Sequence, residues 1–132
     1  MSQGDNWKIR QFSTGATRDV DYDKIDPEAF LDPLALGEYF EFMHRHRFQK
    51  DGSVRDGDNW QKGFTRNAIM KSAWRHFYDI WLMHRGNEPR SEDAKHLFVT
   101  YGVKRAMIES LCGLIFNGFA YIREVVLERN VS

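Results

Sequence analysis

The feature that most constrains the fold is a long helical pattern of apolar residues, which begins at Val103 and continues to about Glu128. Its apolar side chains recur at intervals of three and four residues, the period of an α-helix and not that of a strand. Because the pattern is broad, it predicts a long helix that is buried on more than one side. The apolar positions are Met107, Leu111, Leu114, Ile115, Ala120, Ile122, Val125 and Val126.

Two further segments have the same period, and local start signals place their first residues. Asp32-Pro33 begins a predicted helix over 33–47, because Asp is a frequent N-cap and Pro is favoured in the first turn. Thr65 caps a second helix that runs to about His84 and ends at Gly86.

Shorter elements complete the predicted organisation. A short helix is expected from Ser91 through Phe98, whereas residues 1–30 lack sustained periodicity and predict an extended arm, with a helix start at Asp26-Pro27. No segment shows the alternation of a strand. The 132 residues suit one domain. The expected fold is all-α, with a helical core over 33–128.

Charge and cysteine content exclude several functional classes. The 19 basic and 19 acidic side chains cancel, which argues against a nucleic-acid polymer as partner. The single Cys112 lies among apolar residues and predicts a buried, inert thiol in a reducing compartment. No signal peptide and no run of about 20 apolar residues is present, so we expect a soluble, cytoplasmic protein without a membrane span.

Two pairs of potential metal ligands repeat one spacing on two predicted helices. Glu38 and Glu41 stand three residues apart, and so do His76 and Asp79, so each pair shares a helical face. Two such helices could hold a cation between them. The alternative is that these charges lie on solvated helix faces. The aromatic residues around the second pair look buried, namely Trp74, Phe77, Tyr78 and Trp81.

The surroundings of these pairs suggest further site residues. A carboxylate such as Asp79 among aromatic residues needs a partner, so we expect a cation or an arginine nearby. Glu109 and Asn117 stand eight residues apart, about 80° around their helix, and could reach the same site. An exposed charge and a core amide are the plainer explanations for these two residues.

A loop is predicted over residues 51–63, which contain three glycines and several turn-favouring polar residues. Loops longer than about 12 residues in a compact domain are usually functional or disordered. This one ends in Asp58-Asn-Trp-Gln-Lys62, a set of hydrogen-bond donors around one large ring.

Several catalytic motifs are absent from the sequence. Histidine-dependent phosphohydrolases require an adjacent His-Asp pair, but no histidine of this chain is followed by aspartate. There is also no phosphate-binding glycine loop, no zincin motif and no cysteine pair for zinc. The oxygen-rich set of candidate ligands suits Mg²⁺ or Mn²⁺ best.

The chain resembles the MazG-like all-α nucleoside triphosphate pyrophosphohydrolases, whose signature is Glu-x-x-Glu on one helix and Glu-x-x-Asp on the next. The matching residues are Glu38-x-x-Glu41 and His76-x-x-Asp79. Thr14-Gly-Ala-Thr-Arg-Asp19, Asp58-Asn-Trp-Gln-Lys-Gly63 and Arg75-His76 are similar to the phage dATP/dGTP diphosphohydrolases, which include the MazZ proteins. His76 departs from the glutamate of the wider family, and imidazole is a poor ligand for Mg²⁺ but an acceptable one for Mn²⁺.

The resemblance implies hydrolysis of purine deoxynucleoside triphosphates, dGTP or dATP, to the monophosphate and pyrophosphate. For a phage protein it implies action in the host cytoplasm and supply of dGMP for 2-aminoadenine nucleotide synthesis. Glu38, Glu41 and Asp79 would be catalytic and would hold Mg²⁺ or Mn²⁺, with His76 as a further ligand. The expected substrate-binding residues are Arg18, Asn59, Trp60, Lys62, Arg75 and Asn117.

Two other functions fit the sequence. One is a non-enzymatic helical interaction module, in which the carboxylates form salt bridges. The other is a helical metal-dependent phosphatase that removes phosphates singly. Aromatic residues make up 14% of the chain, more than one small core can hide, so we also expect a homo-oligomer, either a dimer or a tetramer.

Overall fold

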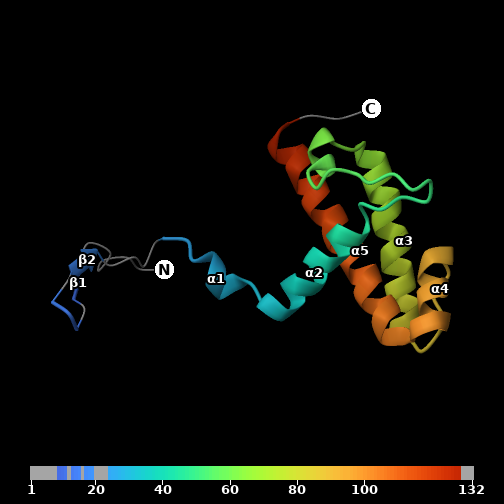
Figure 1. The fold of residues 1–132 in the computed structure, drawn as a ribbon, viewed down its shortest axis with the longest axis horizontal. Helices are drawn as coiled ribbons and strands as arrows, with labels where there is room; N and C mark the ends of the chain where they lie inside the picture. Colours follow the sequence, from blue (N-terminus) through green and yellow to red (C-terminus); the bar gives the residue numbers. More distant parts are fainter. Residues whose placement is uncertain (1–8, 12, 16, 20–23, 129–132) are drawn as a thin grey trace. The chain divides into compact units, whose positions relative to one another are not determined.

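The computed structural model describes residues 9–11, 13–15, 17–19 and 24–128, and it describes the strand residues as backbone only. The chain divides into two compact units, residues 1–33 and 34–132. Figure 1 shows the elements along the chain. The prediction of a predominantly helical protein is confirmed.

The first unit contains a short antiparallel strand pair that the sequence did not predict. β1 (Ile9–Gln11) pairs with β2 (Thr17–Asp19), with Ile9 opposite Asp19. The sequence shows no strand period here, because three residues are too few to show a strand's alternation. A one-turn helix, α1 (Pro27–Phe30), follows Asp26 as expected.

The helices that follow agree closely with the predicted ranges. They are α2 (Pro33–Arg45), α3 (Arg66–His84), α4 (Glu92–Tyr101) and α5 (Val103–Val126). The predicted loop 51–63 contains one short 3₁₀ helix, η1 (Asn59–Lys62).

Local chemistry explains where these helices begin and end. The Thr65 side chain accepts a hydrogen bond from the amide of Ala68 at 3.0 Å, so it is the N-cap of α3 as predicted. Gly102 adopts a φ of 100° and separates α4 from α5. A residue with a Cβ would be strained in that conformation.

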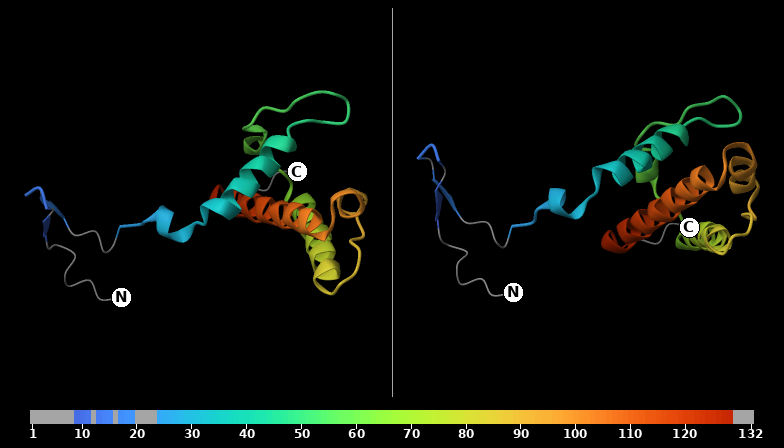
Figure 2. Two further views of the ribbon diagram at one scale, coloured as in Figure 1. Left: turned by 60° about the horizontal axis from the view of Figure 1, so that its bottom comes forward. Right: turned by 90° about the horizontal axis from the view of Figure 1, so that it is seen from below.

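Within the second unit α3 and α5 pack side by side, and α4 packs against α5 (Figure 2). Among the residues that the structure describes, the buried side chains of the hydrophobic core are Phe42, Ile69, Met83, Ala94, Ala106 and Cys112. The predicted burial of Cys112 is therefore confirmed. No described helix is long and apolar enough to cross a membrane.

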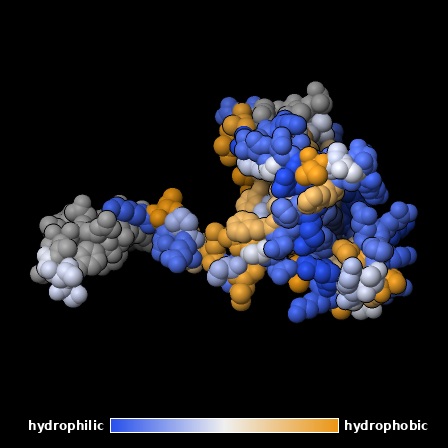
Figure 3. Space-filling model, viewed as in Figure 1, coloured by the Kyte–Doolittle hydropathy of each residue, from blue (hydrophilic) through white to orange (hydrophobic). Residues whose placement is uncertain are grey.

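The predicted burial of the α3 aromatics was wrong. Trp74 is 65% exposed and Trp81 is 51% exposed, and Phe77 and Tyr78 are also exposed. Helix α5 packs against both α3 and α4, in keeping with the expected burial on more than one side, but one set of its apolar residues is exposed: Leu111, Ile115, Phe119, Ile122, Val125 and Val126. Figure 3 shows apolar side chains gathered along α2 and α5 on one face. Periodicity shows which side chains share a face, but it does not show what covers that face.

Candidate functional site

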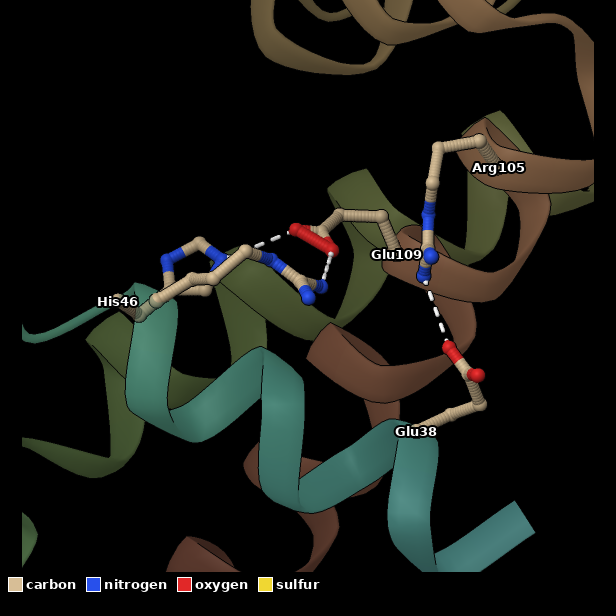
Figure 4. A network of polar contacts seen from close by, with 5 residues as sticks. Glu38, His46, Arg105 and Glu109 are labelled. Atoms are coloured by element: carbon tan, nitrogen blue, oxygen red, sulfur yellow. Dashed lines mark hydrogen bonds and ion pairs between the residues drawn. The ribbon is translucent and has the colours of Figure 1, made fainter. Parts of the chain in front are cut away.

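Ion pairs join α2 to α5 and fix the predicted carboxylate Glu38 (Figure 4). Nη2 of Arg105 donates to Oε1 of Glu38 at 3.2 Å. At the end of α2, Nη2 of Arg45 donates to Oε1 of Glu109 at 2.7 Å, and Nε2 of His46, the next residue, lies 3.3 Å from Oε2 of Glu109. The polar side chains of α2 therefore meet charged partners on α5.

The surroundings of Glu109 favour its ionised form. Burial alone would raise the pKa of Glu109, but the hydrogen bonds from His46 and Arg45, with the positive charge of Arg45, outweigh burial and lower that pKa. Glu109 is only 18% exposed. It is thus a carboxylate held in place between two helices.

His76 of α3 packs directly against the backbone of α5 at Gly113. A Cβ on Gly113 would lie 2.6 Å from Nε2 of His76, closer than side chains tolerate. Burial lowers the pKa of His76, the charge of Arg75 lowers it further, and Asp79 offsets part of the effect. His76 is therefore a half-buried imidazole held by a glycine contact.

Asp79 is almost fully buried and fixes the start of α4. Its Oδ1 accepts hydrogen bonds from the amides of Arg90 at 2.7 Å and Ser91 at 3.1 Å. Its Oδ2 accepts from the Ser91 hydroxyl at 2.5 Å. The hydrogen-bond partners of this carboxylate are two backbone amides and a hydroxyl, and the expected arginines are nearby, since Arg75 and Arg90 line the same cavity.

A charged cavity of about 540 Å³ lies beside these residues. Three of the predicted site residues line it, namely Arg75, His76 and Asp79, together with Glu109. Lys50 and His46, which follow α2, and Arg90 and Ser91, which precede α4, complete much of its polar wall. The cavity thus has both cationic and carboxylate groups.

A smaller cavity of about 170 Å³ adjoins the first, since Phe42 and His46 line both. The predicted residues Asn59 and Trp60 line it. Its other lining side chains include both aromatic and charged groups, namely Phe42, Phe64 and Phe116 with Arg47, Arg55 and Asp56. The guanidinium of Arg123 lies 5.0 Å from the centre of the Trp60 ring, a cation–π contact that holds the ring against α5.

The remaining predicted residues lie elsewhere. Glu41 is exposed, and neither it nor Glu38 lines these two cavities. Lys62 is exposed at the end of η1. The buried Asn117 donates to the Ser72 hydroxyl at 3.0 Å, between α3 and α5.

Arg18, the last of the predicted substrate-binding residues, lies in β2 opposite Arg10, and its side chain is outside the described residues. In the part of the chain that the structure describes, no three His, Cys, Asp or Glu side chains lie close enough together to hold a metal ion. The four predicted ligands therefore do not form such a group in the single chain.

Sequence reasoning missed several residues of this region. Gly113, Lys50, His46, Arg90 and Arg105 have no local pattern that marks them. The pairing of Arg105 with Glu38 spans 67 residues along the chain, so only the packing of α2 on α5 brings the two together.

No protein-family model, curated protein or solved structure matches this chain.

Proposed function

We propose that this protein is a metal-dependent pyrophosphohydrolase of purine deoxynucleoside triphosphates, dGTP or dATP. The observation that carries the proposal is a pair of adjoining cavities that share Phe42 and His46. The smaller one contains most of the aromatic side chains, and the larger one is lined mainly by charged and polar side chains. A nucleotide has the same division, with a flat apolar base at one end and an anionic chain at the other. The motif resemblance supplies the reaction: attack at the α-phosphorus, with pyrophosphate as the leaving group.

The smaller cavity suits the base. Trp60, Phe64 and Phe116 offer aromatic surface, and ring stacking adds stabilisation beyond simple burial. Asn59 carries both a donor and an acceptor, which can hydrogen-bond to the edge of a base. We assign base binding to this cavity.

The larger cavity suits the phosphate chain. Lys50, Arg75 and Arg90 line it and can neutralise phosphate oxygens, where charge builds up in the transition state. Among these, Arg75 is the residue that the sequence also predicted. Lys62 and Arg18 remain proposed phosphate contacts on the resemblance alone.

The metal is assigned to carboxylate oxygens, the donors that Mg²⁺ and Mn²⁺ prefer. Glu38 and Glu41 are the proposed ligands on α2 from the resemblance alone, since neither lines the two cavities, and Glu38 would have to leave Arg105 to bind a cation. The single chain does not complete this set, because Asp79 already accepts three hydrogen bonds. A bound metal would neutralise the triphosphate and lower the pKa of the attacking water.

A second candidate function is a non-enzymatic helical interaction module. One observation favours it: Glu38 and Glu109 both stand in ion pairs between α2 and α5. In such a module the charged side chains hold the helices in position and take no part in catalysis.

A panel of eight nucleoside triphosphates, each incubated with Mg²⁺, Mn²⁺ or EDTA, tests the proposal when the products are resolved by chromatography. We expect pyrophosphate and dGMP or dAMP, with metal only. Release of orthophosphate and a diphosphate would indicate a phosphatase instead. No product with either metal would favour the interaction module.

Matched variants locate the site. Arg75→Ala and Lys50→Ala should each raise KM about tenfold, since a charge-assisted contact to phosphate is worth roughly 1.4 kcal/mol or more. Lys104→Ala, an exposed position on α5 outside both cavities, should leave KM unchanged. Equal KM values for all four proteins would place the phosphate site elsewhere.

A further inference from the structure

His46 lies where the two cavities meet. It is the residue after α2, and among the described residues it is the one ionisable side chain that lines both cavities. Its ring contacts the ring of the buried Phe42, with the two ring centres 4.1 Å apart. The His46 side chain is nevertheless 54% exposed, so a molecule in either cavity can reach the imidazole.

A nucleotide that occupies both cavities brings its α-phosphate to their junction. With the base in the smaller cavity and the phosphate chain in the larger one, the α-phosphate is the group that joins the two parts. In the proposed function, on which the inference rests, the bond between the α-phosphorus and its bridging oxygen breaks. The reacting phosphorus is therefore placed beside His46.

Glu109 of α5 fixes one edge of the His46 ring (Figure 4). Its Oε2 lies 3.3 Å from Nε2 of His46, and its Oε1 accepts a hydrogen bond from Nη2 of Arg45 at 2.7 Å. Because Arg45 helps to hold this carboxylate as an anion, Glu109 selects the neutral tautomer of His46 whose proton is on Nε2. Nδ1 of the same ring then has a free lone pair and can accept a proton.

Other charged groups also surround His46. The larger cavity contributes cations and carboxylates, namely Lys50, Arg75, Arg90, Asp79, Glu92 and Asp93. The smaller cavity contributes Arg47, Arg55 and Asp56. Burial and the charge of Arg75 lower the pKa of His76 on α3, and the charge of His46 lowers it further, so the two imidazoles influence each other. A pH response is therefore assigned to His46 only where a His46 variant removes it.

We propose that His46, oriented by Glu109, accepts the proton of the water that attacks the α-phosphorus. The water oxygen bonds to phosphorus while the bond from phosphorus to the bridging oxygen breaks, and that electron pair leaves with pyrophosphate. The proton passes from the water to Nδ1 of His46 and then to solvent. Glu109 stabilises the imidazolium that forms in between. His46 is thus a catalytic residue and Glu109 a positioning residue.

Profiles of kcat between about pH 5 and pH 8, measured on dGTP or dATP with Mn²⁺, test this role. In the wild type kcat should decline on the acid side, because an imidazolium cannot accept a proton. His46→Gln should lower kcat about 100-fold near neutral pH with little change in KM, and should lose that decline. Glutamine keeps a donor toward Glu109 but takes up no proton. His84→Gln, an exposed position on α3 outside both cavities, should keep the wild-type profile.

Two further variants separate catalysis from folding. His46→Asn should match His46→Gln, and both should retain the wild-type circular dichroism spectrum, because this side chain is exposed. Glu109→Gln should lower kcat about tenfold, a loss typical of groups that orient a histidine. It should also move the acid-side decline to lower pH, since an imidazolium without a neighbouring carboxylate gives up its proton more readily. A merely structural role of Glu109 would leave the pH of the decline unchanged.

The possible failures are distinguishable. A wild-type protein that releases no pyrophosphate with either metal would overturn the proposed function and the role of His46 together. An active wild type whose His46→Gln variant keeps both its kcat and its acid-side decline would overturn the role of His46 alone. A Glu109→Gln variant with a lower kcat and an unmoved decline would overturn the positioning role of Glu109.

Discussion

The two predicted ligand pairs, on α2 and on α3, have the same spacing and opposite surroundings. Glu41 of α2 is exposed, and Glu38 is partly exposed and pairs with Arg105. Asp79 of α3 is 1% exposed and satisfied by hydrogen bonds, and His76 beside it is half-buried. A three-residue step places two side chains on one face, whereas the packing of other helices decides whether that face is exposed to solvent or buried.

The difference in burial decides how much each group contributes to the stability of the fold. A solvent-exposed ion pair contributes only about 0–1 kcal/mol, because water and salt screen it. A buried carboxylate with several hydrogen bonds contributes more, because its loss strands the donors that it satisfied. The predictions below test this contrast, in order of decreasing effect.

The largest effect is expected at Asp79. Asp79→Ala should lower the free energy of unfolding by about 3 kcal/mol without any metal, because the amides of Arg90 and Ser91 lose their acceptor. Urea unfolding measures it. The control Glu41→Gln should stay within about 0.5 kcal/mol of wild type. If Asp79→Ala were as stable as the control, Asp79 would serve as a ligand only and not as a structural anchor.

The next effect concerns the contact between α3 and α5. Gly113→Ala should cost about 1–3 kcal/mol, since its new Cβ would collide with the His76 ring. Thermal unfolding measures this cost. The control is Gly37→Ala on α2, where nothing lies within 4 Å of the new Cβ, so alanine should stabilise the helix by up to about 1 kcal/mol. Similar shifts in the two variants would contradict the tight packing of His76.

The pH dependence of stability should reveal the burial of His76. Because its folded pKa is lowered from the ordinary 6.5, the unfolded chain takes up a proton first as the pH falls. The stability contributed by neutral His76 is therefore complete above pH 6.5 and declines below it. Between pH 7.5 and about 5, the free energy of unfolding of His76→Gln should change less with pH than that of the wild type. His84→Gln, at the exposed end of α3, should keep the wild-type slope.

The smallest effect is expected at the exposed pair on α2. If Glu38 binds a divalent cation, Arg105 competes with that cation for the carboxylate. Arg105→Met should then tighten Mn²⁺ binding about twofold, in keeping with the roughly 0.5 kcal/mol of such a pair. Isothermal titration calorimetry measures it, with Lys104→Met as the neighbouring control. Unchanged or weaker Mn²⁺ binding would show that Glu38 is not a ligand of the metal.

The sequence by itself determined the helices and their ends. Thr65 caps α3, Gly102 separates α4 from α5, and Pro33 begins α2, because caps and turns depend on residues within a few positions of one another. The β1–β2 pair escaped prediction because its strands are too short to carry a pattern.

Only the tertiary structure decided what each helical face meets. Glu38 pairs with Arg105 across 67 residues, and His76 packs on Gly113, contacts that no local spacing encodes. The same applies to the α3 aromatics, which were predicted to be buried and are exposed. Periodicity follows from the geometry of a single helix, whereas burial and charge pairing follow from which helices come together.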